Sequence, residues 1–306
     1  MSTGSKILDR NKLDAAYITF STAFDMVLLR TPTVFQDLAT VIPVTDTTVS
    51  LKWLGDVPKM QEWIGPRAIA KLRAESHNIV TKKWANGLEV DRDDIMDDKL
   101  GLIQPRIDSL AQEGMWSMED LVMDFLNAGT TTGPGGALCY DGQYLYDSDH
   151  TASGAGGTSQ SNVVSGAFSE TTYQSAWEKM MGFVDTKGNS LRVVPDTLVV
   201  GVANRTTARK LIEQQTKATG ESNIEAGTTR LIVHPRVTTT KWSLHATRMA
   251  IRSIILLVRQ APQFAAVQGN SEDTATFLND VFLYGADAKF GAGYGLWQTT
   301  AGGPGA

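Results

Sequence analysis

The feature that most constrains the fold of this sequence is the segment 52–88, which cannot form a core of its own. It contains three of the chain's seven tryptophans, Trp53, Trp63 and Trp84, but its apolar pattern is too sparse for an independent core. Seven lysine and arginine residues stand against three acidic residues, so its net charge is +4. Turn-forming pairs such as Gly-Pro at 65–66 divide it. We therefore predict a long β-rich excursion from the main body of the protein.

The charge of the chain reverses directly after this segment. Residues 88–124 contain eleven acidic and three basic side chains, which gives a net charge of −8. Apolar residues recur there at helical spacing, namely Ile107, Leu110, Ala111, Met118, Leu121, Val122 and Phe125. We predict a long helix near 103–128. Gly114 weakens its middle, and Ser117 with Asp120 resembles an N-cap signature, so we expect a kink or a restart there.

Periodicity also places the other regular elements. It predicts helices at 13–30, 170–184 and 205–215, with Asn204 as cap of the last, and strands at 197–202, 231–233, 253–258 and 277–284. Glycines at 285, 291, 293 and 295 are expected to break the later stretch into short pieces. Residues 33–50 look extended, and the glycine-rich segment 302–306 predicts a flexible tail.

Composition limits the class of protein. The net charge of the 306-residue chain is −5, so no global basic field favours nucleic-acid binding. Cys139 is the only cysteine, which excludes an intrachain disulfide and a cysteine metal cluster. Residues 1–12 contain no apolar signal core, and the aliphatic run 254–258 is too short to span a membrane. We expect a cytoplasmic life cycle, without a signal peptide and without membrane insertion.

A search for catalytic chemistry finds little. Asp147, Asp149 and His150 have the donor groups of a metal site, but a turn built from Asp and Ser side chains is the better interpretation. The acidic run 89–98 lacks the spacing of a calcium-binding loop. Cys139 is more typical of a small buried hydrophobe than of a nucleophile. We predict no enzyme activity, no cofactor and no bound metal.

Several tracts resemble the Mu-like phage major head subunit family. They include WLGDVPKM at 53–60, VDRDDI at 90–95, LNAG at 126–129, CYDGQ at 139–143 and GYGLWQ at 293–298. The resemblance runs from about residue 10 to residue 299, and it is looser from 151 to 280. It implies an α+β structure of the Hong Kong 97-type phage capsid fold. That fold has an N-terminal arm, an extended loop, a peripheral domain with a spine helix, and an axial domain.

Under this resemblance the chain divides into five segments. They are the N-terminal arm at 1–51, the extended loop at 52–88, the peripheral domain with its spine helix at 89–130, the axial domain at 131–245, and mainly peripheral-domain strands with a C-terminal tail at 246–306. A Gly/Ser tract at 151–161 departs from the family pattern and predicts an insertion in a surface loop. The implied function is that of a major capsid protein. Its hexamers and pentamers form an icosahedral shell that encloses double-stranded DNA without sequence-specific binding.

The charge reversal leads to a hypothesis about assembly. The basic loop of one subunit would lie on the acidic spine region of its neighbour, with complementary charge setting the register and tryptophans acting as anchors. The predicted contact residues are Trp53, Trp63, Trp84, Lys71, Arg73, Lys82, Lys83, Asp93, Asp94, Asp97 and Asp98. Each ion pair contributes only about 0–1 kcal/mol, so the tryptophans would dominate. The competing interpretation is that the tryptophans pack on their own subunit and the charged runs are solvated.

The resemblance also implies partners and a location. A scaffold, a portal and a maturation protease are expected, with room for a decoration protein, and the shell would be assembled in the bacterial host cytoplasm and found in the virion. Three alternatives stay open. They are a nanocompartment shell of the same fold, a metal-dependent enzyme using Asp147, Asp149 and His150, and a tail-tube or other virion protein.

Overall fold

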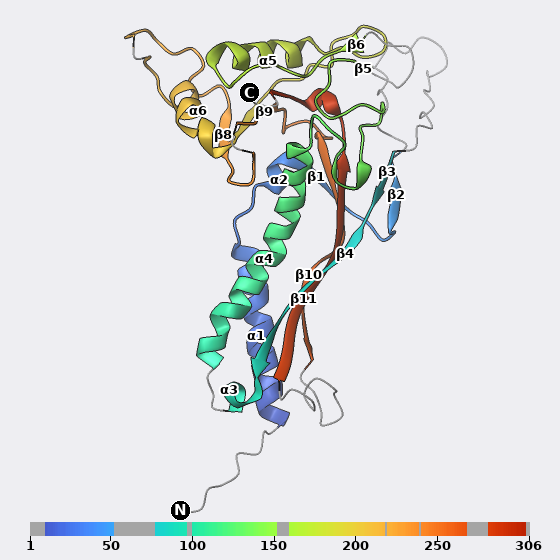
Figure 1. Ribbon diagram of the computed structural model, residues 1–306, viewed down its shortest axis with the longest axis vertical. Coiled ribbons are helices and arrows are strands. Elements are labelled where there is room, and N and C mark those ends of the chain that lie inside the picture. Colours follow the sequence, from blue (N-terminus) through green and yellow to red (C-terminus); the bar gives the residue numbers. More distant parts are fainter. Residues whose placement is uncertain are drawn as a thin grey trace, which may run out of the picture. The chain divides into compact units, whose positions relative to one another are not determined.

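The computed structural model describes residues 10–51, 77–96, 100–151, 159–217, 219–238, 240–267 and 281–303 (Figure 1). The chain forms two compact units. The first comprises Met1–Val34, Thr81–Glu119 and Val258–Phe290, and the second comprises Phe35–Val80, Asp120–Leu257 and Gly291–Ala306. Helix α4 (Leu100–Asn127) and strands β10 (Ile254–Val267) and β11 (Val281–Tyr294) contribute residues to both units.

The first unit packs helices against a β ribbon. Helix α1 (Arg10–Arg30), which confirms the helix predicted at 13–30, lies beside α4 and the strands β4 (Lys82–Asp91), β10 and β11 (Figure 1). The short helix α3 (Arg92–Met96) follows β4. Leu13, Ala16, Phe20 and Phe24 recur every three or four residues and form the buried face of α1.

Aromatic rings fill the core between helix and ribbon. Phe20 meets Tyr284 edge-on, with ring centroids 5.3 Å apart. Phe264 stacks on the same tyrosine with its centroid 5.9 Å away, and Phe24 lies 5.6 Å from Phe264. Ile107 of α4, which is fully buried, belongs to the same cluster. Burial of these rings is the main stabilising term of this unit.

Helix α4 runs without a break from Leu100 to Asn127, so the restart predicted at Ser117 is wrong. The Ser117 hydroxyl donates to the carbonyl oxygen of Gly114 within the helix, at 2.8 Å, and therefore caps no new helix. Gly114 has a packing role instead, because a Cβ atom there would lie 3.1 Å from Pro262 of β10. The glycine allows helix and strand to approach closely.

Strand β11 pairs with β4 in antiparallel register from Val281↔Asp91 to Phe290↔Lys82. The glycines predicted to break this stretch lie inside one continuous strand, so that prediction is wrong for positions 285, 291 and 293. A Cβ atom at Gly285 would lie 2.6 Å from the Asn86 carbonyl oxygen, and one at Gly293 would lie 2.5 Å from Ile79. These glycines permit close contacts and do not end the strand. Residues 277–280 of the predicted strand lie outside the described part.

The second unit is built around a four-stranded sheet in the order β12-β9-β7-β8. Its strands are β7 (Thr197–Val200), β8 (Arg230–Val233), β9 (Trp242–His245) and β12 (Thr300–Gly303). Helix α5 (Glu170–Gly182) contacts β9 and β12, and helix α6 (Arg205–Ile212) contacts β8. The strands predicted at 197–202 and 231–233 and the helix predicted at 170–184 are confirmed.

The predicted flexible tail is wrong for its first two residues, because Gly302 and Gly303 lie in β12 and are buried. A Cβ atom at Gly302 would come 2.8 Å from the Trp242 carbonyl oxygen, and one at Gly303 would come 2.5 Å from the Trp242 indole nitrogen. Glycine is present here because the backbone of β9 is too close for a side chain.

The ends of the two helices in this unit differ. Ser169 caps α5, since its hydroxyl accepts from the Thr172 N–H and the Thr172 hydroxyl accepts from the Ser169 N–H. Asn204, the predicted cap of α6, caps nothing, because the chain is already helical there in the short 3₁₀ helix η2 (Val202–Asn204). The Asn204 side chain donates to the Thr240 carbonyl oxygen instead.

Residues 33–50 contain more structure than predicted. A short helix α2 (Phe35–Leu38) precedes strands β1 (Ala39–Pro43) and β2 (Thr48–Ser50). Strand β1 pairs with β10, and β2 pairs with β3 (Asn78–Val80). A further small pair joins β5 (His150–Thr151) to β6 (Ser159–Gln160).

Buried hydrogen bonds mark the interior of the second unit. Asn162 is fully buried, donates to the Leu145 carbonyl oxygen at 2.7 Å and accepts from the Asp147 N–H at 2.9 Å. His245 is also buried, and its ring nitrogens lie 2.8 Å from the Ser243 hydroxyl and 3.4 Å from the Ser253 hydroxyl. Burial lowers the pKa of His245 from 6.5 to about 4.

Candidate inter-subunit surfaces

Trp84 is the one predicted anchor within the described residues, and it packs on its own subunit. Its ring stacks on Phe290 with centroids 5.0 Å apart and planes 8° apart, and its indole N–H donates to the Phe290 carbonyl oxygen at 3.1 Å. The side chain nevertheless remains 37% exposed. Most of the Trp84 ring therefore packs on its own subunit, as the competing interpretation predicts. A contact of the exposed remainder with a neighbour stays a prediction.

Lysines gather at the end of the ribbon where β4 begins. Lys82 and Lys83 are exposed on β4, and Lys83 lies directly opposite Lys289 of β11. Like charges directly opposite each other across two strands destabilise the pair. Lysines on an edge strand such as β4 also discourage the addition of further strands. We call Lys82, Lys83 and Lys289 the lysine cluster.

The other end of β4 is acidic. Asp91 ends the strand, and its carboxylate accepts from the Asp93 N–H at 2.8 Å. Asp93 and Asp94 occupy the first turn of α3, where negative charge favours the helix dipole. The ten residues of β4 place this acidic end about 30 Å from the lysine cluster. The structure thus brings together the predicted lysines, and separately the predicted aspartates, but not the two sets.

The remaining predicted contact residues cannot be placed. Trp53, Trp63, Lys71, Arg73, Asp97 and Asp98 lie outside the described residues. The pairing of the basic segment with the acidic segment of a neighbour therefore remains a prediction for these positions.

An apolar row on α1 was not anticipated from the sequence. Ile18 and Leu29 are 63% and 86% exposed, and Met26 is 47% exposed. A helix buries one stripe, and these three residues fall outside the stripe that packs on the ribbon. The sequence signal for this row was the position of three apolar residues outside the buried stripe of the helix. Large apolar side chains that are exposed on a helix mark a surface available for contact.

The residues of the metal-enzyme alternative do not form a ligand set. The His150 ring is fully buried, and its two nitrogens contact Asp141 Oδ2 at 2.7 Å and the Leu145 carbonyl oxygen at 3.2 Å. Asp147 accepts from the Ser148 N–H, as in the predicted turn. Among the described side chains no three histidine, cysteine, aspartate or glutamate residues come together as metal ligands.

Cys139 is buried with 3% exposure, as predicted for a small apolar side chain. Burial raises the pKa of its thiol well above the ordinary value, and the nearby charge of Asp141 raises it further. The side chain is therefore a neutral thiol in the folded protein. None of the described helices is long and apolar enough to cross a membrane.

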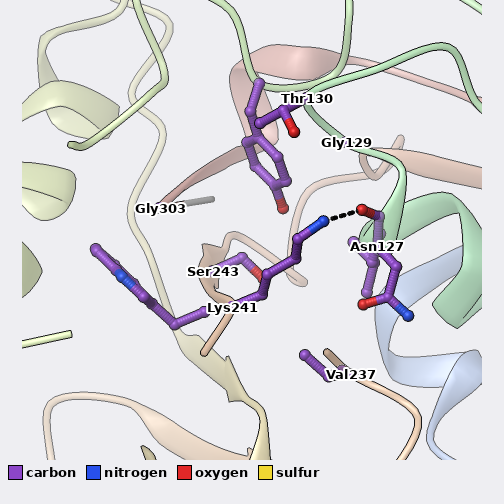
Figure 2. A pocket seen from close by; sticks show the side chains of 10 residues that line it. Asn127, Gly129, Thr130, Val237, Lys241, Ser243 and Gly303 are labelled. Atoms are coloured by element: carbon purple, nitrogen blue, oxygen red, sulfur yellow. Dashed lines mark hydrogen bonds between the residues drawn. The ribbon is translucent and has the colours of Figure 1, made fainter. Parts of the chain in front are cut away.

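Within the second unit, side chains hold the C-terminal end of α4 in place. Figure 2 shows the Lys241 ammonium group reaching the carbonyl oxygen of Asn127, the last residue of the helix. The Asn127 amide donates to the Arg236 carbonyl oxygen and accepts from the Thr238 N–H. A cation at a helix C-terminus is stabilising. The cavity beside these residues measures about 10 Å³, which is too small for any ligand larger than water.

Comparisons with known proteins agree across nearly the whole chain. The sequence matches the family model described as Mu-like prophage major head subunit gpT at residues 13–170, 164–237 and 236–304. The Mu-like prophage FluMu major head subunit of Haemophilus influenzae is 28% identical over 285 residues, which are 93% of this chain and 70% of that protein. The major capsid protein of Escherichia phage Mu is 22% identical over 267 residues, which are 87% of this chain and 65% of that protein.

A solved structure matches the fold. The procapsid of bacteriophage JBD30 has a chain with a TM-score of 0.61 and 24% identity, and the match covers 96% of this chain and 75% of that chain. At that identity the likeness shows the fold alone. It confirms the α+β capsid fold that the sequence tracts implied.

Proposed function

Because the chain belongs to the Mu-like prophage major head subunit family, and is thus a major capsid protein of the phage head, we propose how it assembles. Copies associate head to tail into hexamers and pentamers, which form an icosahedral shell around double-stranded DNA. Heterologous contacts close into rings when the rotation between neighbours permits it. The role is structural, without catalysis, and the assembly takes place in the host cytoplasm.

The observation that carries this proposal is the separation of charge along β4. The lysine cluster and the acidic end with Asp93 and Asp94 are about 30 Å apart in one extended strand, so they cannot pair with each other. The lysine cluster of one copy and the acidic end of another copy have opposite charge, so these two patches are complementary between copies. Such patches set the register and the encounter rate of neighbours more than their affinity.

We further propose that the segments keep the roles that the sequence implied. Helix α4, with 28 residues and a length of about 42 Å, serves as the spine of the peripheral domain. Residues 131–245 form the axial domain, and residues 52–88 form the extended loop. A scaffold, a portal, a maturation protease and a decoration protein are the proposed partners of the shell. The family match favours a phage head over a nanocompartment shell or a tail tube.

The test reverses the charge of the described lysines. In Lys82→Glu/Lys83→Glu, we expect fewer shells in electron micrographs and a lower yield in sedimentation, because each subunit loses attraction at every contact. Reversal of Asp93 and Asp94 to lysine in the same chain should restore part of the yield. The control is Lys187→Glu, which changes an exposed lysine of the second unit.

Two results would count against the proposal. Shells at unchanged yield and unchanged salt sensitivity in the lysine variant would show that the charge contact is absent. A wild-type chain that forms no shells, rings or tubes at any concentration would show that self-assembly itself is wrong.

A further inference from the structure

The second unit contains an open cleft of about 750 Å³ that is lined by apolar side chains together with three arginines. Trp177 of α5, Val194 and Met249 supply the apolar surface. Val194 is 53% exposed although it lies only three residues before the buried start of β7. Tryptophan and arginine are the residues most enriched at the centres of protein contacts. This composition is typical of a docking surface.

Arg230 is ion-paired with Asp37, but the other two arginines that line the cleft have charge to offer. The Arg248 side chain is 91% exposed, and its Nε atom lies 3.8 Å from Asp196. The carboxylate of Asp196 is already engaged, because it accepts from the backbone N–H groups of Thr247 and Arg248. Arg192 is exposed and has no carboxylate partner among the described residues. Its φ of 55° is unusual for a residue other than glycine.

A second feature of the same unit has the opposite character. Ile224 is 74% exposed and stands between Glu221 and Glu225 in the loop that joins α6 to β8. Glu225 is held by the Gln174 amide at 2.8 Å, whereas Glu221 is exposed. An isolated exposed isoleucine needs no explanation, but this one is flanked by acidic groups whose charge is opposite to that of the arginines in the cleft.

The loop that carries Ile224 is rigidly held. Its neighbour Asn223 is buried, and the Asn223 amide donates to the carbonyl oxygens of Leu211 at 2.8 Å and Gln214 at 2.7 Å. The Asn223 N–H donates to the Gln215 carbonyl oxygen at 2.8 Å. These bonds fix the backbone on one side of Ile224, so the loop holds the residue at a defined place on the surface. A preorganised loop loses little entropy when it binds.

We infer that Ile224 of one copy seats in the cleft of a neighbouring copy, with Glu221 facing Arg248 and Arg192. The inference rests on the proposed self-assembly and names one contact within it. Ile224 does not fill its own cleft, because it is 74% exposed in the subunit. The loop that carries Ile224 continues into Gly227, Thr228 and Thr229, which line the cleft, but Ile224 itself is not a lining residue. The two contacting surfaces therefore differ, and a contact between them across two copies is heterologous, as a ring requires.

The first experiment truncates the protrusion. In Ile224→Ala the protein concentration needed for shell formation should rise about tenfold, as expected for an anchor residue. The thermal unfolding of the unassembled subunit should not change, since the side chain is exposed. Val202→Ala is the matched control, because Val202 is a 51% exposed aliphatic residue of the same unit outside both patches. Equal assembly of the Ile224 and Val202 variants would overturn the inference.

The second experiment exchanges the charges. Arg248→Glu and Glu221→Arg should each reduce the yield of shells, and the double variant should restore it. Arg192→Asn, which keeps a residue that tolerates positive φ, should weaken assembly without any effect on folding. Single variants that assemble like the wild type, or a double variant no better than either single one, would overturn the contact. A wild-type chain without shells would instead overturn the proposed function, and the contact with it.

Discussion

The two units of the molecule differ in what fills their interiors. In the first unit, rings such as Phe20, Phe264 and Tyr284 pack between helix and ribbon, and the buried polar residues described there are Thr31, Thr81 and Glu119. The second unit buries many more polar side chains, including Asn162 and His245. Apolar burial has no direction, whereas a satisfied hydrogen-bond network specifies one geometry. The first unit is therefore held mainly by apolar burial, and the second by apolar burial together with hydrogen bonds that specify one geometry.

The comparison predicts the largest stability loss for an aromatic residue of the first unit. Phe20→Ala should lower the free energy of unfolding of the unassembled subunit by about 3–5 kcal/mol, because the fully buried ring leaves a cavity between α1 and Tyr284. Urea unfolding followed by circular dichroism measures this. Leu29→Ala, on the 86% exposed face of the same helix, should change it little. Equal losses in both variants would contradict the proposed core.

The second unit should respond to acid through His245. Its folded pKa of about 4 lies below the unfolded value of 6.5, because burial disfavours the charged ring. Stability from the neutral ring is thus complete above pH 6.5 and is lost as the pH falls toward 4, by at most about 3 kcal/mol. The free energy of unfolding, measured between pH 7 and pH 4, should fall less steeply in His245→Gln than in the wild type.

Asn162→Ala should have a smaller effect, of about 1–3 kcal/mol, because the Asp147 N–H loses its acceptor and the Leu145 carbonyl oxygen loses a donor. Thermal unfolding of the unassembled subunit measures the loss. Asn204→Ala, whose amide makes a bond at the surface, is the control and should show less. A loss for Asn162→Ala larger than that for Phe20→Ala would reverse the comparison between the units.

The smallest of these effects is expected at a helix end. Ser169→Ala should destabilise the second unit by about 1 kcal/mol, since the Thr172 N–H at the start of α5 loses its acceptor. Ser169→Asp, which retains a capping oxygen, should recover most of that stability. If the alanine and aspartate variants unfold alike, the cap contributes nothing.

The sequence predicted elements whose signal is local. The helices at α1 and α5 and the strands β7 and β8 follow from side-chain period, because each buries one face or both. The glycines of β11 and β12 were misread for the opposite reason. Gly285 and Gly302 satisfy a contact with a strand far away in the chain, and nothing near them in the sequence reveals that neighbour. Glycine as a breaker and glycine as a point of close approach look identical in one sequence.

The candidate surfaces show the same limit. The lysine cluster was foreseen in part, because Lys82 and Lys83 are adjacent in the chain, but Lys289 joins them only through strand pairing. The cleft was not foreseen, since Trp177, Val194 and Met249 come from three separate segments. The stacking of Trp84 on Phe290 also depends on register. Residues that share a strand can be grouped from sequence, whereas residues that share a surface across strands cannot.

The single cysteine of the chain is a built-in chemical probe of local opening in the second unit. Because Cys139 is sealed inside and its thiol is protonated there, a maleimide reagent can react only while the surrounding structure is open. The labelling rate of free subunits, compared with that of shells, would thus report how often this part of the protein opens in each state. No engineered probe is required, since every subunit already has this one cysteine at a single position.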